Sequence, residues 1–234
     1  MNKELWIAVQ QKLAAAGLYR REIDGIPGIG TRTALKAWQR SKGQQVLAEP
    51  DARQLRMLGI EPPKQSALIV PPWGIILDAK MGLHEQRDKA ALQAFLKSDG
   101  STLGDPSKLP WCGDLVETVM LNSGYGPVPG NPYLARNWRT YGVASTPGYY
   151  VLTAFWRGSP DGTDGHVGFV VGISEDGSRL RVRGGNQQNQ IGDVWIAAKR
   201  VLSGGHRKPE KYKGPFSPLP ILNDNAEPLS VNEA

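Results

Sequence analysis

The stretch Gly165-His166-Val167-Gly168-Phe169-Val170-Val171-Gly172 alternates as a β-strand with two different faces does. The turn Glu175-Asp176-Gly177 and a second extended run, 180–186, follow it, which predicts an antiparallel hairpin. A three-residue loop with Gly177 in the left-handed conformation would set the register. The opposed pairs would then be Gly172–Leu180, Val170–Val182, Gly168–Gly184 and His166–Asn186.

Directly opposed residues share one face of a sheet, with Cβ atoms about 5 Å apart and within reach of a hydrogen bond. The hairpin therefore predicts contact between His166 and Asn186. A two-residue turn would instead pair His166 with Gln187, which is the reserve partner. The pair Gly168 and Gly184 lies on the same face and leaves room for a helix to approach closely.

Further elements surround this hairpin on both sides. Apolar residues recur at helical spacing over 85–97 and 112–121, and the runs 150–156 and 194–201 have the composition of strands. Helices that precede strands are typical of the α+β class with an antiparallel sheet. We therefore expect an α+β fold with helices packed on that sheet.

The first sixty residues have a purely helical pattern. We expect one helix that ends near Gly17, a second that opens at Thr31 and ends near Gly43, and a third over 50–58. The stretch 23–30 is turn chemistry and interrupts the helical pattern. The expected core consists of Trp6, Leu13, Leu35, Trp38 and Leu55.

The domain organisation follows from these patterns. Residues 1–60 form a three-helix module, and the proline-containing segment 61–72 is a linker. Residues 73–208 form the second domain, and 209–234 read as a loose tail rich in proline and asparagine. The length of 234 residues suits one or two domains.

Composition narrows the class of protein. Hydrophobic residues make up 40% and charged residues 21%, as in ordinary globular proteins, and there is no apolar run long enough to span a membrane. Residues 1–60 hold 10 Lys and Arg against 5 Asp and Glu (+5), and the other residues 18 against 17 (+1). Anionic partners should therefore prefer the first module. The basic residues scatter over it, so we expect no nucleic-acid binding.

Several motifs in the first module resemble the peptidoglycan-binding domain of many cell-wall hydrolases. The resemblance covers about residues 4–59, with a tryptophan at position 38 where the family usually has phenylalanine. It implies wall binding in a shallow groove beside Asp24 and Gly25, with Arg32 nearby. The motifs are Val9-Gln10-Gln11-Lys12-Leu13, Gly17-Leu18-Tyr19, Ile23-Asp24-Gly25-Ile26-Pro27-Gly28, Thr33-Ala34-Leu35 and Ala37-Trp38-Gln39-Arg40.

The single cysteine, Cys112, is the candidate nucleophile. It excludes an internal disulfide and a cysteine-based zinc site, and it stands at the expected start of a helix. Unpaired N–H groups and the helix dipole favour the thiolate there, which is the attacking form. A small buried hydrophobe is the ordinary alternative for a lone cysteine.

A cysteine, an imidazole and an amide that orients the ring make up a cysteine-hydrolase site. We expect Asn186 to accept a hydrogen bond from one ring nitrogen of His166 and thereby fix its tautomer. The other nitrogen would take the proton of Cys112. The backbone N–H of Cys112 would hold part of the oxyanion.

The second domain resembles the CHAP and NlpC group of amidases and endopeptidases, which have a papain-like fold. The resemblance spans about residues 75–208 and implies Cys112 as nucleophile, His166 as base and Asn186 as the third polar residue. The NlpC form Asp-Cys-Ser-Gly is absent, and so is the glutamine that precedes the cysteine in many CHAP enzymes. The motifs are Pro110-Trp111-Cys112-Gly113-Asp114-Leu115-Val116, Ala135-Arg136-Asn137-Trp138, Gly165-His166-Val167-Gly168-Phe169 and Gly184-Gly185-Asn186-Gln187.

Other residues are candidates for contact with substrate or for simpler roles. Substrate contact is expected from Trp111, Asp114, Trp138 and Gln187, although core burial is the default for a tryptophan. His84 reads as an exposed or capping residue and His206 as a loop residue. Asp161 and Asp164 read as turn chemistry, because the full alternating calcium loop is missing. We expect no metal and no cofactor.

These observations together predict an endolysin-like peptidoglycan hydrolase that cuts an amide bond of the stem peptide. A non-catalytic wall-binding protein and a phage-tail or secretion-system effector amidase remain alternatives. The N-terminal residues lack the pattern of a signal peptide, so we expect synthesis in the host cytoplasm and later release to the wall or periplasm. We also expect a monomer without stable membrane insertion.

Overall fold

The computed structural model describes residues 1–44, 46–62, 67–223 and 227–230. The chain divides into two compact units, Met1–Ser66 and Ala67–Ala234. This division falls inside the segment 61–72, which the sequence predicts as a linker. Over the described ranges, no helix has the length and apolar character that crossing a membrane requires.

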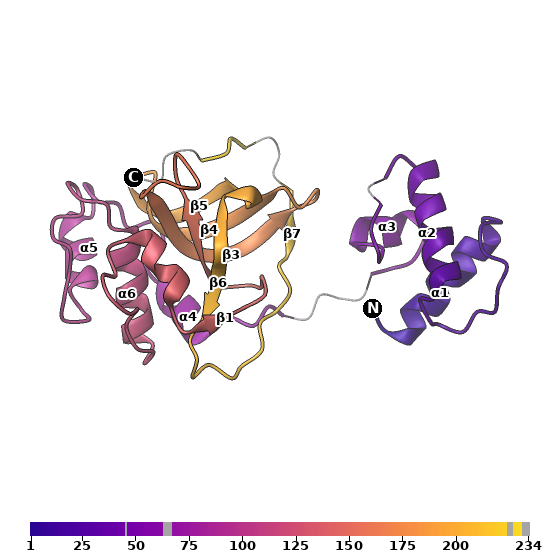
Figure 1. The fold of residues 1–234 in the computed structure, drawn as a ribbon, viewed down its shortest axis with the longest axis horizontal. Helices are drawn as coiled ribbons and strands as arrows, with labels where there is room; N and C mark the ends of the chain where they lie inside the picture. The colour runs from indigo at the N-terminus through magenta and orange to yellow at the C-terminus, as the bar shows by residue number, and fades with distance from the viewer. Residues whose placement is uncertain (45, 63–66, 224–226, 231–234) are drawn as a thin grey trace. The chain divides into compact units, whose positions relative to one another are not determined.

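Within its described residues, the first unit contains three helices, α1 (Lys3–Ala15), α2 (Ile29–Ser41) and α3 (Ala52–Met57) (Figure 1). Side-chain caps begin two of them: Asn2 accepts from the N–H of Leu5 at 2.9 Å, and Asp51 accepts from that of Gln54 at 2.7 Å. The helices enclose one apolar cluster. Its buried residues include the five that the sequence predicts, Trp6, Leu13, Leu35, Trp38 and Leu55.

Three helices and a 3₁₀ helix precede most of the sheet in the second unit. They are α4 (Pro72–Asp78), α5 (Lys89–Leu96), α6 (Cys112–Asn122) and η1 (Ala135–Thr140). The sequence predicts α6 closely, whereas α5 is shorter than the expected 85–97. Helix α4 was not expected; it begins at Pro72, the last residue of the expected linker, and buries Trp73 and Leu77.

The strands form one sheet that is antiparallel except for β7. Because helices precede this sheet in the chain and pack on it, the fold is α+β. The strand order is β1-β6-β2-β3-β4-β5 with antiparallel neighbours, and β7 pairs with β3 in parallel. The expected strand 194–201 is divided by η2 (Ala198–Arg200). The strands are β1 (Val143–Ala144), β2 (Val151–Trp156), β3 (Gly165–Ser174), β4 (Arg179–Gln187), β5 (Gln190–Ala197), β6 (Val201–Lys208) and β7 (Ile221–Leu222).

In the middle of the β3–β4 hairpin, the register is the one that a three-residue loop predicts. At both ends of the hairpin the pairing differs from that prediction. Val170 lies opposite Val182, and Gly177 has φ +74°, as expected. Nearer the turn, a shift places Gly172 opposite Arg181 instead of Leu180. At the other end, the pairing of β4 with β5 shifts between Gly184 and Gln187, and this irregularity changes where the side chains of Asn186 and Gln187 point.

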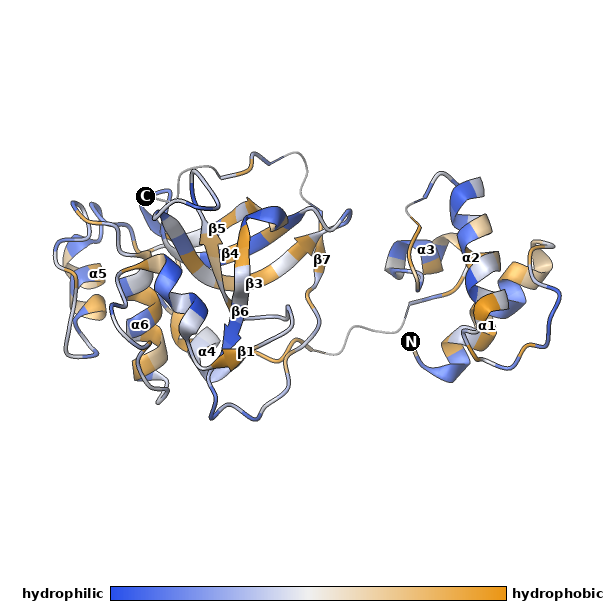
Figure 2. Cartoon of the chain, in the orientation of Figure 1, coloured by the Kyte–Doolittle hydropathy of each residue, from blue (hydrophilic) through white to orange (hydrophobic). Residues whose placement is uncertain are grey.

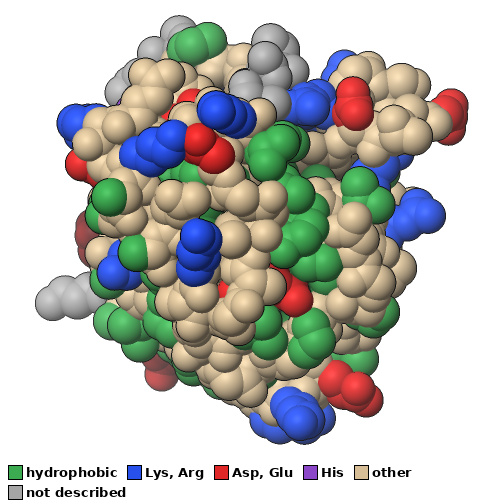
Figure 3. Space-filling model, turned by 90° about the vertical axis from the view of Figure 1, so that its left-hand side faces the viewer, with side chains coloured by type: hydrophobic (Ala, Val, Ile, Leu, Met, Phe, Trp, Pro, Cys, Tyr) green, Lys and Arg blue, Asp and Glu red, His purple; other side chains and the backbone are tan. Residues whose placement is uncertain are grey.

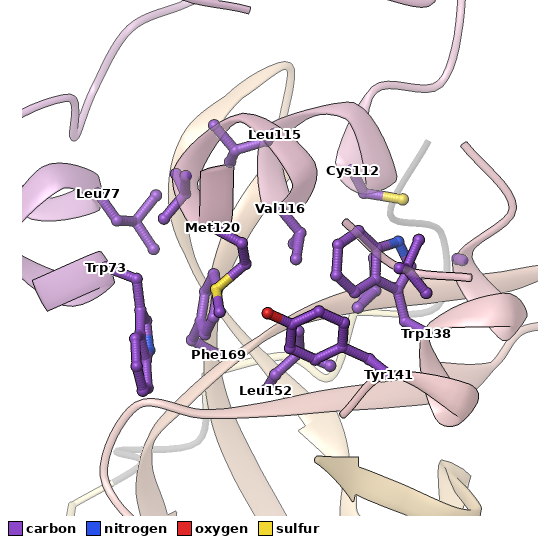
Figure 4. Packing of buried hydrophobic residues seen from close by; sticks show 14 of the residues in the cluster. Trp73, Leu77, Cys112, Leu115, Val116, Met120, Trp138, Tyr141, Leu152 and Phe169 are labelled. Carbon is purple, nitrogen blue, oxygen red and sulfur yellow. The ribbon is translucent and has the colours of Figure 1, made fainter. Parts of the chain in front are cut away.

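The two faces of β3 contribute to two apolar clusters. Val167, Phe169 and Val171 pack with α4 and α6, around the residues drawn in Figure 4. Val170 belongs to a second cluster with Phe155, Leu180 and Val182. In Figure 2 bands of hydrophobic colour lie along α6 and the strands of the sheet, and in Figure 3 basic side chains are scattered among acidic and hydrophobic ones on the face shown.

The segment after Lys208 packs more closely than a loose tail. Tyr212 is buried, and its ring lies 4.8 Å from that of Trp73 in an edge-on contact. Ile221 and Leu222 add the parallel strand β7. The expectation of a tail was wrong for these residues because two aromatic side chains, Tyr212 and Phe216, reach the main cluster.

Candidate functional site

Cys112 is the first residue of α6 and is 5% exposed (Figure 4). The Trp111 side chain gives α6 no capping hydrogen bond, so the first N–H groups of the helix face the thiol region without a side-chain acceptor from the cap. Gly113 packs directly on the Pro132 carbonyl, where a Cβ would lie only 2.2 Å from the oxygen. The start of α6 is therefore held in place by backbone contact.

The thiol of Cys112 lies against the backbone near the beginning of β3, at Val167. Burial raises its pKa above the ordinary value, while hydrogen bonds from the backbone of Val167 and Gly113, and the charge of Arg157, lower it. The net direction is upward. Cys112 is therefore a neutral thiol at rest, and its sulfur contacts the residue that follows His166.

The imidazole of His166 is fully buried and bonded to Gln187. The carboxamide lies 3.0 Å from Nε2, and with its oxygen toward the ring its nitrogen donates to the carbonyls of Val182 (3.0 Å) and Gly192 (2.5 Å). In this orientation Nε2–H of the ring donates to Gln187. The remaining nitrogen, Nδ1, is then the basic one.

The prediction that Asn186 orients the ring was wrong in position by one residue. Asn186 has φ +59°, and β4 changes register between Gly184 and Gln187. This irregularity turns Asn186 away and places the next side chain against His166. Asparagine tolerates the left-handed conformation better than most residues, which is the only local signal for it in the sequence.

The sulfur of Cys112 and the imidazole of His166 do not lie on the same face of β3. His166 pairs with Phe155 across β2 and β3, and Phe155 belongs to the cluster on the face opposite α6. Val167 belongs to the cluster that contains Cys112. The His166 ring therefore lies on the same face of the sheet as Phe155. The sulfur of Cys112 contacts the backbone of the next residue, Val167, whose side chain lies on the opposite face.

Helix α6 approaches the sheet at a glycine, but not at the expected pair. A Cβ on Gly185 would lie 2.6 Å from the ring of Trp111 and 3.0 Å from Leu115. A Cβ on Gly168 would instead meet Val182 and the carbonyl of Arg183. The expectation failed because Gly168 lies on the other face of the sheet.

Three of the expected substrate-contacting residues are buried. Trp111 is 1% exposed and donates from Nε1 to Glu85 at 3.0 Å, and Trp138 is fully buried and donates to the Pro132 carbonyl at 2.8 Å. Asp114 accepts from Thr102 and from the N–H of Leu103, and burial raises its pKa to about 6. As a first-turn residue Asp114 matches one prediction, but none of the three faces solvent. Gln187, the fourth, contacts His166.

An open groove of about 280 Å³ lies beside the start of α6. Pro110, Arg157 and Asn186 line it, together with the exposed residues Lys108 and Asn189. Sequence patterns give no signal for Arg157 or Lys108, because the groove forms only where the loop 106–110 meets the ends of β2 and β4. The other lining residues are Glu85, Pro106, Ser107 and Leu109.

The remaining candidates have structural partners. Nδ1 of His84 accepts from the N–H of Gln86 at 3.1 Å, as a capping residue does. His206 lies in β6 rather than in a loop, with Nδ1 2.8 Å from Oγ1 of Thr153. The loop carbonyl of Asp164 accepts from Arg136. Across the described ranges, no group of three His, Cys, Asp or Glu side chains is placed to hold a metal ion.

The first unit has a second candidate surface around Asp24. The buried Gln10 donates to the Asp24 carboxylate at 2.9 Å and accepts from the N–H of Gly25 at 2.8 Å. The hydrogen bond from Gln10 also lowers the pKa of Asp24. Arg32 donates to the Pro27 carbonyl at 2.9 Å, so the three expected wall-binding residues border one loop.

The surroundings of this loop are apolar and accessible. Ile26 is 62% exposed and Ile29 is 86% exposed, although both are large hydrophobic side chains. Exposed apolar side chains beside an ordered polar loop are typical of a binding surface. The first unit is thus a helical binding module.

Comparison with known proteins agrees with that class. Residues 2–58 match the family of peptidoglycan binding domains, and the N-terminal unit is such a domain. Neither the curated proteins nor the solved structures gave a match to the chain. Cell-wall binding is thereby supported for the first unit.

Proposed function

We propose that the chain is an endolysin-like peptidoglycan hydrolase in which the first unit holds the wall and the second cuts an amide bond of the stem peptide. The observation that carries the proposal is the meeting of Cys112 with β3 at Val167, directly beside His166, whose ring is oriented by Gln187. A helix-start thiol next to an oriented imidazole is the arrangement of a cysteine hydrolase on a papain-like scaffold.

The reaction follows from the states of these groups. Nδ1 of His166 takes the proton of the Cys112 thiol, and the thiolate attacks the amide carbon. The backbone N–H of Cys112 stabilises the oxyanion. His166 then protonates the leaving amine as the C–N bond breaks and a thioester forms. Water, deprotonated by His166, hydrolyses the thioester and restores the thiol.

Because burial raises the pKa of the Cys112 thiol, the start of α6 is not sufficient to produce the thiolate, and we assign the deprotonation of the thiol to His166. A thiol that is neutral at rest needs a base in contact with it before it can attack. For catalysis the imidazole of His166 must reach the sulfur around the beginning of β3, at residues 166 and 167, when substrate is bound.

A second candidate function is wall binding without catalysis. Two observations favour it: burial raises the pKa of Cys112, and the ring of His166 leaves β3 on the face of Phe155. Both candidates keep the peptidoglycan-binding role of the first unit. They differ only in what the second unit does.

Clearance of purified walls by the full chain separates the two. Cys112→Ala and His166→Ala should each abolish clearance, whereas His206→Ala, a histidine elsewhere in the same sheet, should retain it. Iodoacetamide should inactivate the enzyme and EDTA should not. Clearance by both variants at the wild-type rate would refute the mechanism, and an inert wild type that still pulls down with walls would establish the second candidate.

The proposed site of action is the bacterial cell wall. We infer release of the protein from the cytoplasm of a host to its wall, as a lytic enzyme, with a tail-associated or effector amidase as the alternative. Attachment to the wall by the first unit raises the local concentration of substrate for the second. Mass spectrometry of the released fragments would identify the bond that is cut.

A further inference from the structure

Asn186 is a buried polar side chain that the proposed reaction does not use. It is 5% exposed, it lines the groove beside α6, and the described residues offer its carboxamide no hydrogen-bond partner. The buried side-chain atoms that lack a partner among the described residues do not include those of Asn186, so its amide atoms reach the groove. The carboxamide can therefore exchange hydrogen bonds with water for hydrogen bonds with a peptide that enters the groove.

The groove is also adjacent to the thiol. Pro110, two residues before Cys112, forms part of its wall, and Arg157 both lines the groove and acts electrostatically on the sulfur. A peptide in the groove would therefore pass the nucleophile. The groove is slightly below the usual ~300–1,000 Å³ of ligand pockets, so it suits a short part of a larger chain.

The charges around the groove are unequal. Lys108 and Arg157 contribute two positive charges and Glu85 one negative charge, which gives +1. Glu85 is buried and accepts from Nε1 of Trp111, so its carboxylate is turned toward α6. The exposed part of the groove is thus cationic at Lys108, and a carboxylate is the complementary ligand group.

We propose that this groove is the substrate subsite of the hydrolase, in which Asn186 binds the peptide backbone of the stem and Lys108, with Arg157, selects stems that carry a carboxylate beside the cut amide. The inference rests on the proposed function. It assigns Asn186 to the binding of substrate and leaves the orientation of His166 to Gln187.

Binding by the full chain in the Cys112→Ala background tests the subsite without turnover. The probes are soluble muropeptides from a glycosidase digest of walls, either untreated or amidated at their carboxyl groups with carbodiimide and ammonium. The first unit contributes equally to every variant. Calorimetric titration then measures changes that arise in the groove.

Asn186→Gly keeps the left-handed backbone and removes the carboxamide, so it should lower the affinity for both probes alike, by about fivefold. Lys108→Gln should lower the affinity for the untreated probe by about two- to fivefold and leave the affinity for the amidated probe unchanged. Lys97→Gln, an exposed lysine in the C-cap of α5, is the matched control and should change neither.

Unchanged affinity in both groove variants would overturn the inference, as would an equal loss of both probes in Lys108→Gln. Asn186→Asp provides a second check, because a negative charge there should weaken the untreated probe more than the amidated one. Wall clearance by the wild type reports the proposed function separately. A chain that binds with these preferences but does not clear walls refutes hydrolysis alone.

Discussion

The carboxamide of Gln187 lies 3.0 Å from Nε2 of His166, and the same side chain reaches the carbonyls of Val182 and Gly192. One buried residue therefore ties the imidazole to two strands of the sheet. Asn186, its neighbour, faces the groove instead. Because the backbone at the end of β4 is irregular, these two neighbouring polar side chains face different surroundings: Gln187 faces the ring of His166 and Asn186 faces the groove.

Gln187→Ala should reduce wall clearance at least tenfold, because His166 loses the group that fixes its tautomer. It should also lower the free energy of unfolding by about 1–3 kcal/mol, since two strand carbonyls lose a donor. Denaturant titration and clearance assays measure the two effects. Gln86→Ala, at an exposed position, should change neither, and full clearance by Gln187→Ala would contradict the assigned role.

Gly185→Ala should displace the start of α6, because its Cβ would lie 2.6 Å from the ring of Trp111. The sulfur one residue further along the chain should move with the ring, so that clearance falls together with the melting temperature. Gly192→Ala on the adjacent strand is the control, since its Cβ meets its neighbours at 3.5 Å. Equal behaviour of the two variants would show that α6 does not need the close approach at Gly185.

Asp114→Asn should stabilise the protein at high pH. Burial raises the pKa of Asp114 to about 6 from 3.8, so its contribution to stability is complete below pH 4 and is lost as the pH rises through 6. Asparagine keeps an oxygen for Thr102 and Leu103 and carries no charge. We expect a gain of about 1–3 kcal/mol in the free energy of unfolding at pH 8 and little gain at pH 4. A gain that does not depend on pH would contradict this account.

Gly25→Ala should impair wall binding by the first unit. Gly25 has φ +74°, and a Cβ there would lie 2.8 Å from the carbonyl oxygen of Lys3. The strain should cost about 1–3 kcal/mol and distort the loop that Gln10 holds around Asp24. Gly28→Ala is the control in the same loop, because its Cβ would meet nothing within 4 Å. Pull-down with purified walls should separate the two variants.

Much of the fold could be predicted from local patterns. The five core residues of the first unit, helix α6 and the middle of the β3–β4 hairpin follow from periodicity and turn chemistry, which depend on neighbouring residues only. Helix α4 and the packing of Tyr212 on Trp73 could not be predicted, because those elements are stabilised by partners distant in the chain.

Local patterns of residues predict the helical wall-binding module, the α+β class and a single thiol at the start of a helix. Contacts between distant segments determine which side chain touches His166, which glycine lets α6 approach the sheet, and that Trp111, Asp114 and Trp138 are buried. A change of register by one residue moves every later side chain to the other face of a strand. Such a shift arises from packing between distant segments, and an asparagine at position 186, which tolerates the left-handed backbone, is the only local sign of it.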